Sequence, residues 1–196
     1  MDNPELDTRS RILSETVRLM VERRGQKIRI SDIAAAAGVS RQAVYLHFPN
    51  RTQLLIAAAR YVDESNDIEQ RLAPLRATRG GRQALRELIE FWGTYIPLIH
   101  DLARALLAVR YYDRAAAAAW ADRIDNLYFG CRNAIQCLEY DGDLRSDLDP
   151  DRAADLLWSL LSIEVWENLT IERGWQVEQY IHWIQEAASR LLIKTI

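Results

Sequence analysis

The sequence predicts an all-α protein. Apolar residues recur three and four positions apart along most of the chain, which is the spacing of a helix with one buried face. Glycine and proline divide these segments into about nine helices. Outside a short alternation at 27–30, the sequence has no recurring strand pattern and no Asn-Gly hairpin.

Four helices are expected in the first third of the chain. Thr8 is a candidate N-cap for the first helix, and Gly25 is expected to end it. Two short helices are expected at about 30–37 and 41–47, and a fourth at about 51–70. A stretch rich in helix breakers follows the fourth helix, so we expect a domain boundary there.

The rest of the chain is also predicted to be helical. A strongly amphipathic segment at 85–99 contains Pro97, whose ring would crowd the carbonyl of Gly93. Because glycine lowers that steric cost, we expect a kink at Pro97 rather than a stop. Further helices are expected at about 101–111, 114–140, 150–172 and 176–194.

The charge is distributed unevenly along the chain. The net charge is -3, but residues 1–61 hold 10 basic and 6 acidic residues, a net of +4, and the remainder holds 15 and 22, a net of -7. A basic N-terminal region followed by an acidic remainder indicates that the N-terminal region binds a polyanion, although chance can give the same pattern at such small counts.

Targeting and redox signals are absent from the sequence. The N-terminus is polar and acidic, unlike a signal peptide, and no apolar run approaches the roughly 18 residues of a membrane span. Cys131 and Cys137 lie six positions apart, on different faces of a predicted helix, so small buried side chains are expected rather than a disulfide or a metal site. A cytoplasmic location and no membrane partner are therefore expected.

The segment with the clearest functional pattern is 33–48. Small residues after Ile33 form a short helix, Gly38 supplies a left-handed turn, and Ser40 caps the next helix. Val44 and Phe48 lie four apart and face inward, which leaves the polar residues of that helix on its other faces. This arrangement is typical of a helix-turn-helix whose second helix enters a DNA major groove.

These residues resemble the TetR family of transcriptional regulators. The likeness covers about residues 9–60 and is carried, without gaps, by Ile33-Ala34, Ala37-Gly38-Val39-Ser40, Tyr45-Leu46-His47-Phe48, Arg51 and Leu54-Leu55. The resemblance implies an N-terminal three-helix domain with the helix-turn-helix at 5–65. It also implies a C-terminal helical bundle at 66–196 that senses a ligand and dimerises.

Two positions depart from the family pattern. The family usually has threonine where Arg29 stands, and arginine cannot accept a backbone N–H. We therefore expect Ser31 or Asp32 to cap the helix and to shift its start by a residue or two. The family's usual lysine is Arg51 here, which still offers a positive charge to a phosphate.

The resemblance implies a double-stranded DNA operator as partner. Arg41 would pair with guanine, Gln42 with adenine and Ala43 with a thymine methyl. The complete set of predicted DNA-binding residues is Arg29, Ser31, Ser40, Arg41, Gln42, Ala43, Tyr45, His47 and Arg51. Solvated surface is the alternative for Arg41 and Gln42, and a metal ligand is a remote alternative for His47.

A small-molecule effector is the second implied partner. The resemblance places a pocket among the middle helices, where six residues offer aromatic faces and polar tips. These are Trp92, Tyr95, His100, Tyr111, Trp120 and Tyr128. Aromatic walls suit an apolar, aromatic or cationic effector, whereas core packing is the alternative for each residue singly. No cofactor and no metal are expected.

The third implied partner is a second copy of the chain. A single helix-turn-helix binds weakly, so such modules act in pairs on palindromic sites. The last two helices are apolar on most sides, which favours a homodimer interface there. The predicted interface residues are Trp158, Leu161, Val165, Ile181, Ile184, Ala188 and Leu191. The alternative is that both helices fill the core of a monomer.

Two other classes of function compete with a regulator. An enzyme is disfavoured because the three histidines lie on separate segments and no hydrolase, zinc-protease or phosphate-loop motif is present. A helical adaptor that keeps the DNA-binding fold but binds only protein stays open, and an operator-binding assay separates it from a repressor released by its effector.

Overall fold

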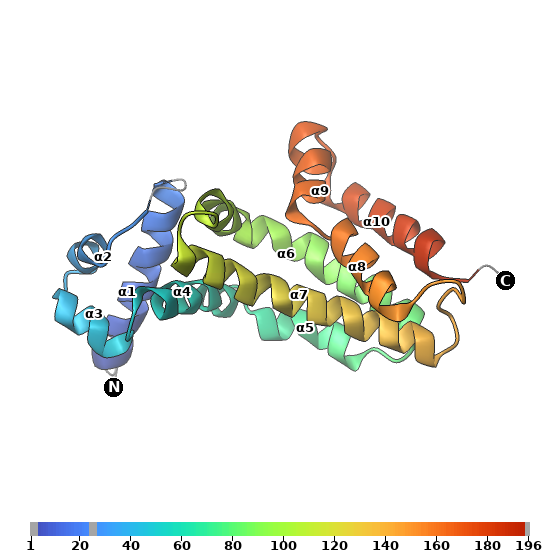
Figure 1. The fold of residues 1–196 in the computed structure, drawn as a ribbon, viewed down its shortest axis with the longest axis horizontal. Coiled ribbons are helices and arrows are strands. Elements are labelled where there is room, and N and C mark those ends of the chain that lie inside the picture. The colour runs from blue at the N-terminus through green and yellow to red at the C-terminus, as the bar shows by residue number, and fades with distance from the viewer. Residues whose placement is uncertain (1–3, 24–26, 195–196) are drawn as a thin grey trace. The chain divides into compact units, whose positions relative to one another are not determined.

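The computed structural model describes residues 4–23 and 27–194, and this part of the chain is all-α, as predicted. In chain order the elements are α1 (Pro4–Glu22), α2 (Ile30–Ala36), α3 (Arg41–His47), α4 (Arg51–Ser65), α5 (Ile68–Ala77), α6 (Gly81–Val109), α7 (Arg114–Tyr140), α8 (Pro150–Leu160), α9 (Ile163–Glu167), the π-helical η1 (Asn168–Glu172) and α10 (Val177–Leu192) (Figure 1). The bounds predicted for α2, α3 and α7 are confirmed within a residue.

The ends of two other helices differ from the prediction. Helix α1 begins at Pro4, earlier than a cap at Thr8 would allow, and proline suits the first turn because it lacks an N–H. Its predicted end, Gly25, lies outside the described residues. Helix α4 ends at Ser65 instead of continuing to 70, because Asp67 adopts a left-handed φ of 53° that no helix continues through.

Three later segments also differ from the prediction. Helix α6 continues past Pro97 without a stop, so the segments expected at 85–99 and 101–111 form one helix. The segment expected at 150–172 is instead divided after Leu160, where the Ser162 hydroxyl accepts a hydrogen bond from the backbone N–H of Val165, 3.3 Å away, and so starts a new helix. Pro74 lies inside α5 rather than in a loop.

The chain separates into two compact units. The first contains the residues up to Ile68 together with Ile99–Ile124, and the second contains Glu69–Leu98 and Asp125–Ile196. Helices α6 and α7 therefore contribute one part to each unit. The expected division into 5–65 and 66–196 stays a prediction about domains, because the two units are discontinuous in sequence.

The first unit has a single apolar core. Residues of α1, α2, α3 and α4 share it with the end of α6 and the start of α7. Its fully buried side chains include Ile12, Ile33, Val44, Leu54 and Leu106. The helix-turn-helix thus packs on residues from the middle of the sequence, and its geometry depends on where those residues lie.

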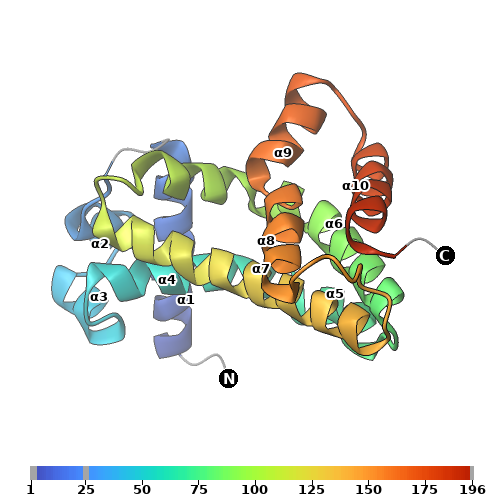
Figure 2. The ribbon, with the colours of Figure 1, turned by 45° about the vertical axis from the view of Figure 1, so that its right-hand side comes forward.

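The second unit is held by close helix contacts. Figure 2 shows α8 and α10, and residues of the two helices are in contact. The indole N–H of Trp92 donates to the carbonyl of Leu161 over 2.5 Å. Gly93 lets α10 approach α6, because a Cβ at this position would lie 2.4 Å from Cγ1 of Ile181.

Gly81 provides a test of this packing. A Cβ at Gly81 would lie 2.4 Å from the backbone nitrogen of Leu138, and backbone cannot move aside as a side chain does. We expect Gly81→Ala to lower the free energy of unfolding by about 2 kcal/mol or more. Gly130→Ala is the control, since its Cβ would meet only Cδ1 of Leu88, 3.3 Å away. Urea unfolding measures both, and equal stabilities would contradict this packing.

Candidate nucleic-acid interface

The turn between α2 and α3 has the geometry that the sequence predicts. Gly38 has a φ of +66°, and the N–H of Val39 donates to the carbonyl of Ala34 over 2.9 Å. The Ser40 hydroxyl accepts from the N–H of Ala43 over 3.1 Å, which confirms it as the cap of α3. These contacts fix the direction in which α3 leaves the turn.

Helix α3 is held from one side. Val44 and Phe48 are buried, as the spacing predicts, and Ile33 of α2 is buried in the same core. The guanidinium of Arg11 in α1 donates to the carbonyl of Ala37, at the end of α2, over 2.9 Å. The position of α3 against α1 and α2 is therefore set by both apolar and polar contacts.

The opposite face of α3 is open. Arg41 and Gln42 are exposed and make no hydrogen bond within residues 4–23 and 27–194. Tyr45 is 44% exposed, and Ala43 and His47 are half-buried. The structure therefore brings the predicted reading residues together on one surface. Because the side-chain polar atoms of Arg41 and Gln42 have no partner among the described residues, they are available to an external one.

Leu46 belongs to the same surface and was missed by the sequence reasoning. It is 81% exposed, an unusual state for leucine, and it lies one helical turn after Gln42. Exposed apolar groups on a reading helix contact thymine methyl groups. The sequence does contain a signal for this exposure. Leu46 lies two positions from both Val44 and Phe48, so it cannot share their buried face of the helix.

The start of α2 differs from the expectation. The helix begins at Ile30, directly after Arg29, so its start is not shifted. The carboxylate of Asp32 accepts from the backbone N–H of Arg29 over 3.2 Å and from Arg23 over 2.7 Å. Asp32 thus stabilises the first turn from within the helix, and the hydrogen bond from Arg29, followed by that from Arg23, lowers the pKa of its carboxyl. Ser31 is exposed.

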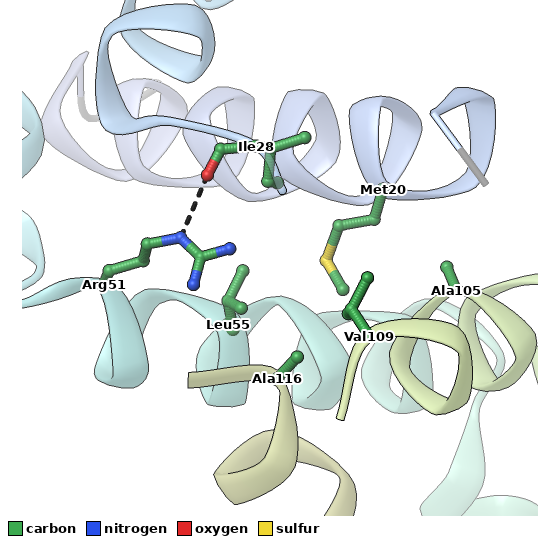
Figure 3. A pocket seen from close by; sticks show the side chains of 7 residues that line it. All are labelled: Met20, Ile28, Arg51, Leu55, Ala105, Val109 and Ala116. Atoms are coloured by element: carbon green, nitrogen blue, oxygen red, sulfur yellow. Dashed lines mark hydrogen bonds between the residues drawn. The ribbon is translucent and has the colours of Figure 1, made fainter. Parts of the chain in front are cut away.

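Arg51 is turned away from solvent. Its side chain is 19% exposed, and its Nε donates to the carbonyl of Ile28 over 3.0 Å. A terminal nitrogen pairs with Oδ1 of Asp113 over 2.6 Å. Figure 3 shows the guanidinium reaching from the start of α4 toward Ile28, beside a cavity of about 10 Å³ that Val109 and Ala116 also line. Its expected contact with DNA stays a prediction.

The partner carboxylate, Asp113, is buried between α6 and α7. Its side chain is 3% exposed, and Oδ1 also accepts from the N–H groups of Ala115 and Ala116, over 3.1 and 3.4 Å, at the start of α7. Burial raises the pKa of Asp113, but the hydrogen bond and charge of Arg51, together with the backbone hydrogen bonds from Ala116 and Ala115, outweigh it and hold this pKa below its usual value.

The lowered pKa of Asp113 makes stability depend on pH. A depressed folded pKa contributes stability above the unfolded pKa, near 4, and this stability is lost as the pH falls through the folded value. Between about pH 5 and pH 2 we expect the wild type to lose more unfolding free energy than Asp113→Asn. Urea unfolding at each pH measures the two slopes, and equal slopes would contradict the role of this pair.

The predicted sensor residues fall in both units. In the second unit Trp92 and Tyr95 are buried, burial raises the pKa of Tyr95 to about 12, and the Tyr128 hydroxyl donates to Asp155 over 3.0 Å. In the first unit His100 is half-buried and Trp120 packs on the apolar core.

Tyr111 is 82% exposed, and its hydroxyl accepts from Arg110 over 2.7 Å. Most of the Tyr111 side chain therefore faces solvent. The six residues stay a prediction for the effector site.

Most predicted interface residues are covered by their own chain. Leu161, Ile181, Ile184 and Ala188 are buried, whereas Trp158, Val165 and Leu191 are partly exposed. The four buried residues fill the core of the second unit, which was the stated alternative. The exposed large apolar residues are instead Leu156 of α8 and Trp183 of α10, at 38% and 42%, together with Ile171 of η1 at 55%.

The described residues include no cluster of metal ligands and no helix that could span a membrane. Within the part of the chain that the structure describes, no three His, Cys, Asp or Glu residues gather as metal ligands. Cys131 is a buried free thiol, as expected, and burial raises its pKa to about 12, whereas Cys137 is exposed, so the expectation of a buried side chain is wrong there. No described helix is both long and apolar enough to cross a membrane.

Comparison with known proteins identifies the family. The model of the bacterial regulatory proteins of the tetR family matches residues 12–58, which run from α1 into α4 and include the turn at Gly38. The chain belongs to the TetR family. The resemblance drawn from the sequence is therefore confirmed, and the family's members are regulators of transcription rather than enzymes.

One curated relative extends the similarity beyond this domain. The HTH-type transcriptional repressor LfrR of Mycolicibacterium smegmatis is 33% identical over 135 residues. The matched segment covers 67% of this chain and 65% of LfrR, less than two thirds of the relative.

Solved structures share the TetR-type fold over nearly the whole chain. A putative transcriptional regulator from Saccharomonospora viridis, in complex with choline, has a TM-score of 0.72 at 25% identity and covers 96% of this chain and 99% of its own. NalD of Pseudomonas aeruginosa, the secondary repressor of the MexAB-OprM multidrug efflux pump, has a TM-score of 0.70 at 20% identity, with 98% of each chain covered.

Proposed function

We propose that this TetR-family chain is a ligand-responsive transcriptional repressor that binds a palindromic operator as a homodimer. The observation that carries the proposal is the open face of α3, where Arg41 and Gln42 have no partner among the described residues, on a helix fixed by buried Val44. Arginine matches the acceptors of guanine and glutamine matches adenine. Ala43 and Leu46 would meet thymine methyl groups.

Phosphate contacts would orient this helix in the groove. Tyr45 and His47 lie beside the reading residues, and Ser31 and Ser40 lie at the starts of α2 and α3. Hydroxyls and backbone N–H groups at helix starts suit phosphate oxygens, which fix register without reading sequence. The net charge of +4 over residues 1–61 favours the same partner.

Dimerisation would use the outer surfaces of α8 and α10. Leu156 and Trp183 are the exposed apolar residues of these two helices, and Trp183 also contacts Trp175 edge to face. Large apolar side chains in water favour association with a partner surface. Two copies would present two α3 helices to two half-sites of a palindrome.

The effector would act by population shift. A compound that binds better to a form whose two α3 helices mismatch the operator would draw the dimer off DNA. The related regulator bound to choline supports a small organic effector of this kind. The predicted aromatic residues favour an apolar or aromatic compound, with a cation as a further class.

The test is selection of DNA by the purified chain. Duplex fragments of the source genome are passed over the immobilised protein, and retained fragments are sequenced. We expect retention of a short inverted repeat, with affinity that falls as salt rises. Retention of no specific sequence, with capture of a protein partner instead, would support the adaptor and reject the repressor.

A further inference from the structure

We propose that Asp113 is a positioning residue for DNA recognition, acting through Arg51, and that Arg51 is not a phosphate contact. The inference rests on the proposed function. Asp113 lies in the turn between α6 and α7, 62 residues from Arg51 in sequence and outside the helix-turn-helix. Their ion pair joins that turn to the first residue of α4.

Three segments meet at the Arg51 guanidinium. Nε holds the carbonyl of Ile28, which precedes α2, and the terminal nitrogen holds Asp113, which also caps the first turn of α7. Arg51 itself follows α3 by four residues. A change at this one side chain therefore affects both the entry to α2 and the exit from α3.

The burial of the pair argues that it stays closed when DNA binds. Releasing Arg51 to a phosphate would leave the Asp113 carboxylate, only 3% exposed, without its charge partner. An unpaired buried charge is strongly destabilising. The attraction between Arg51 and a phosphate at the surface is weak by comparison, because water screens it. Nε and one terminal nitrogen of Arg51 are thus held within the protein, and the start of α4 takes its position from the α6–α7 turn.

A second ion pair between α4 and α7 serves as the matched control. Arg60 of α4 pairs with Asp122 of α7 over 2.6 Å, but the Arg60 side chain is 58% exposed. Exposed pairs contribute little, and Asp122 keeps a contact with Arg123 at 3.2 Å. Arg60→Gln therefore removes the same chemistry from the same helix, α4, without leaving a charge as deeply buried as that of Asp113.

The experiment is a double-mutant cycle on DNA affinity. Asp113→Asn keeps an acceptor for the first turn of α7, so it is the variant most able to fold. Asp113→Asn, Arg51→Gln, their combination and Arg60→Gln are titrated with the duplex selected by the wild type, at several salt concentrations. Urea unfolding and stoichiometric titration count the folded, active protein in each sample.

We expect Asp113→Asn and Arg51→Gln each to weaken operator affinity about tenfold. The double variant should bind the operator no more weakly than either single variant. The dependence of affinity on salt concentration should be unchanged, and Arg60→Gln should bind with the affinity of the wild type.

Three results would overturn the inference. The first is a plot of log affinity against log salt concentration whose slope is smaller in magnitude by about one in Arg51→Gln alone, which would indicate a lost phosphate contact. The second is a tighter complex with Asp113→Asn. The third is lower stability with unchanged affinity of the active protein. A wild type that selects no duplex would reject the proposed function and this inference with it, whereas normal wild-type binding with unaffected variants rejects the inference alone.

Discussion

Replacing Arg41 and Gln42 together by alanine is expected to lower operator affinity by at least about 100-fold, because each side chain offers a bidentate contact to one base. Both residues are exposed and unpartnered within the described chain, so the free energy of unfolding should change little. Fluorescence anisotropy with a labelled operator duplex measures the affinity, and urea unfolding measures the stability.

The matched control for this loss is Arg86→Ala. Arg86 is an exposed arginine of α6 in the second unit, so the variant loses the same charge from a different surface. We expect a change in affinity of less than about twofold, at the scale of a general charge effect. An equal loss in both variants would mean that net charge, not the face of α3, determines binding.

Placing arginine at both Leu156 and Trp183 is expected to separate the dimer and to weaken operator binding by about 100-fold or more. Like charges would then face each other across the proposed interface, and the second half-site would no longer bind at high effective concentration. Sedimentation equilibrium measures the association, and anisotropy measures operator affinity. Both side chains are partly exposed, so the separated chains should stay folded.

Phe129→Arg is the control for the dimer variant. Phe129 is 66% exposed on α7, so the substitution also adds a charge to an exposed apolar position, but away from α8 and α10. We expect it to stay dimeric. A dimer that survives both arginines, or a monomer produced equally by Phe129→Arg, would locate the interface elsewhere.

The local features of the helix-turn-helix could be predicted because their causes lie within a few residues. Gly38 has no Cβ to oppose a left-handed φ, and Ser40 has a hydroxyl within reach of the N–H of Ala43. Val44 and Phe48 share a face by helical spacing alone. Short-range geometry therefore sufficed for the bounds of α2 and α3 and for the exposed reading face.

Features that depend on distant residues could not be predicted in this way. No local pattern reveals that Arg51 meets Asp113, because the fold alone brings them together. The apolar pattern of the last two helices predicts that they are buried. It does not show whether they are buried in the core of their own chain or against a second copy of the chain. Ile184 and Ala188 are buried in the core of their own chain, whereas the exposed Trp183 is not among the interface residues predicted from the sequence.

Selection of DNA by the Arg41→Gln variant tests the central claim most directly. Two pools of random duplex are enriched in parallel, one with the wild type and one with the variant, and the recovered sites are compared. If Arg41 reads a base from the open face of α3, the two sites will differ at one base pair in each half-site and agree elsewhere. Recovery of an identical site at lower yield would contradict base reading by this residue and, with it, the proposed role of the α3 face.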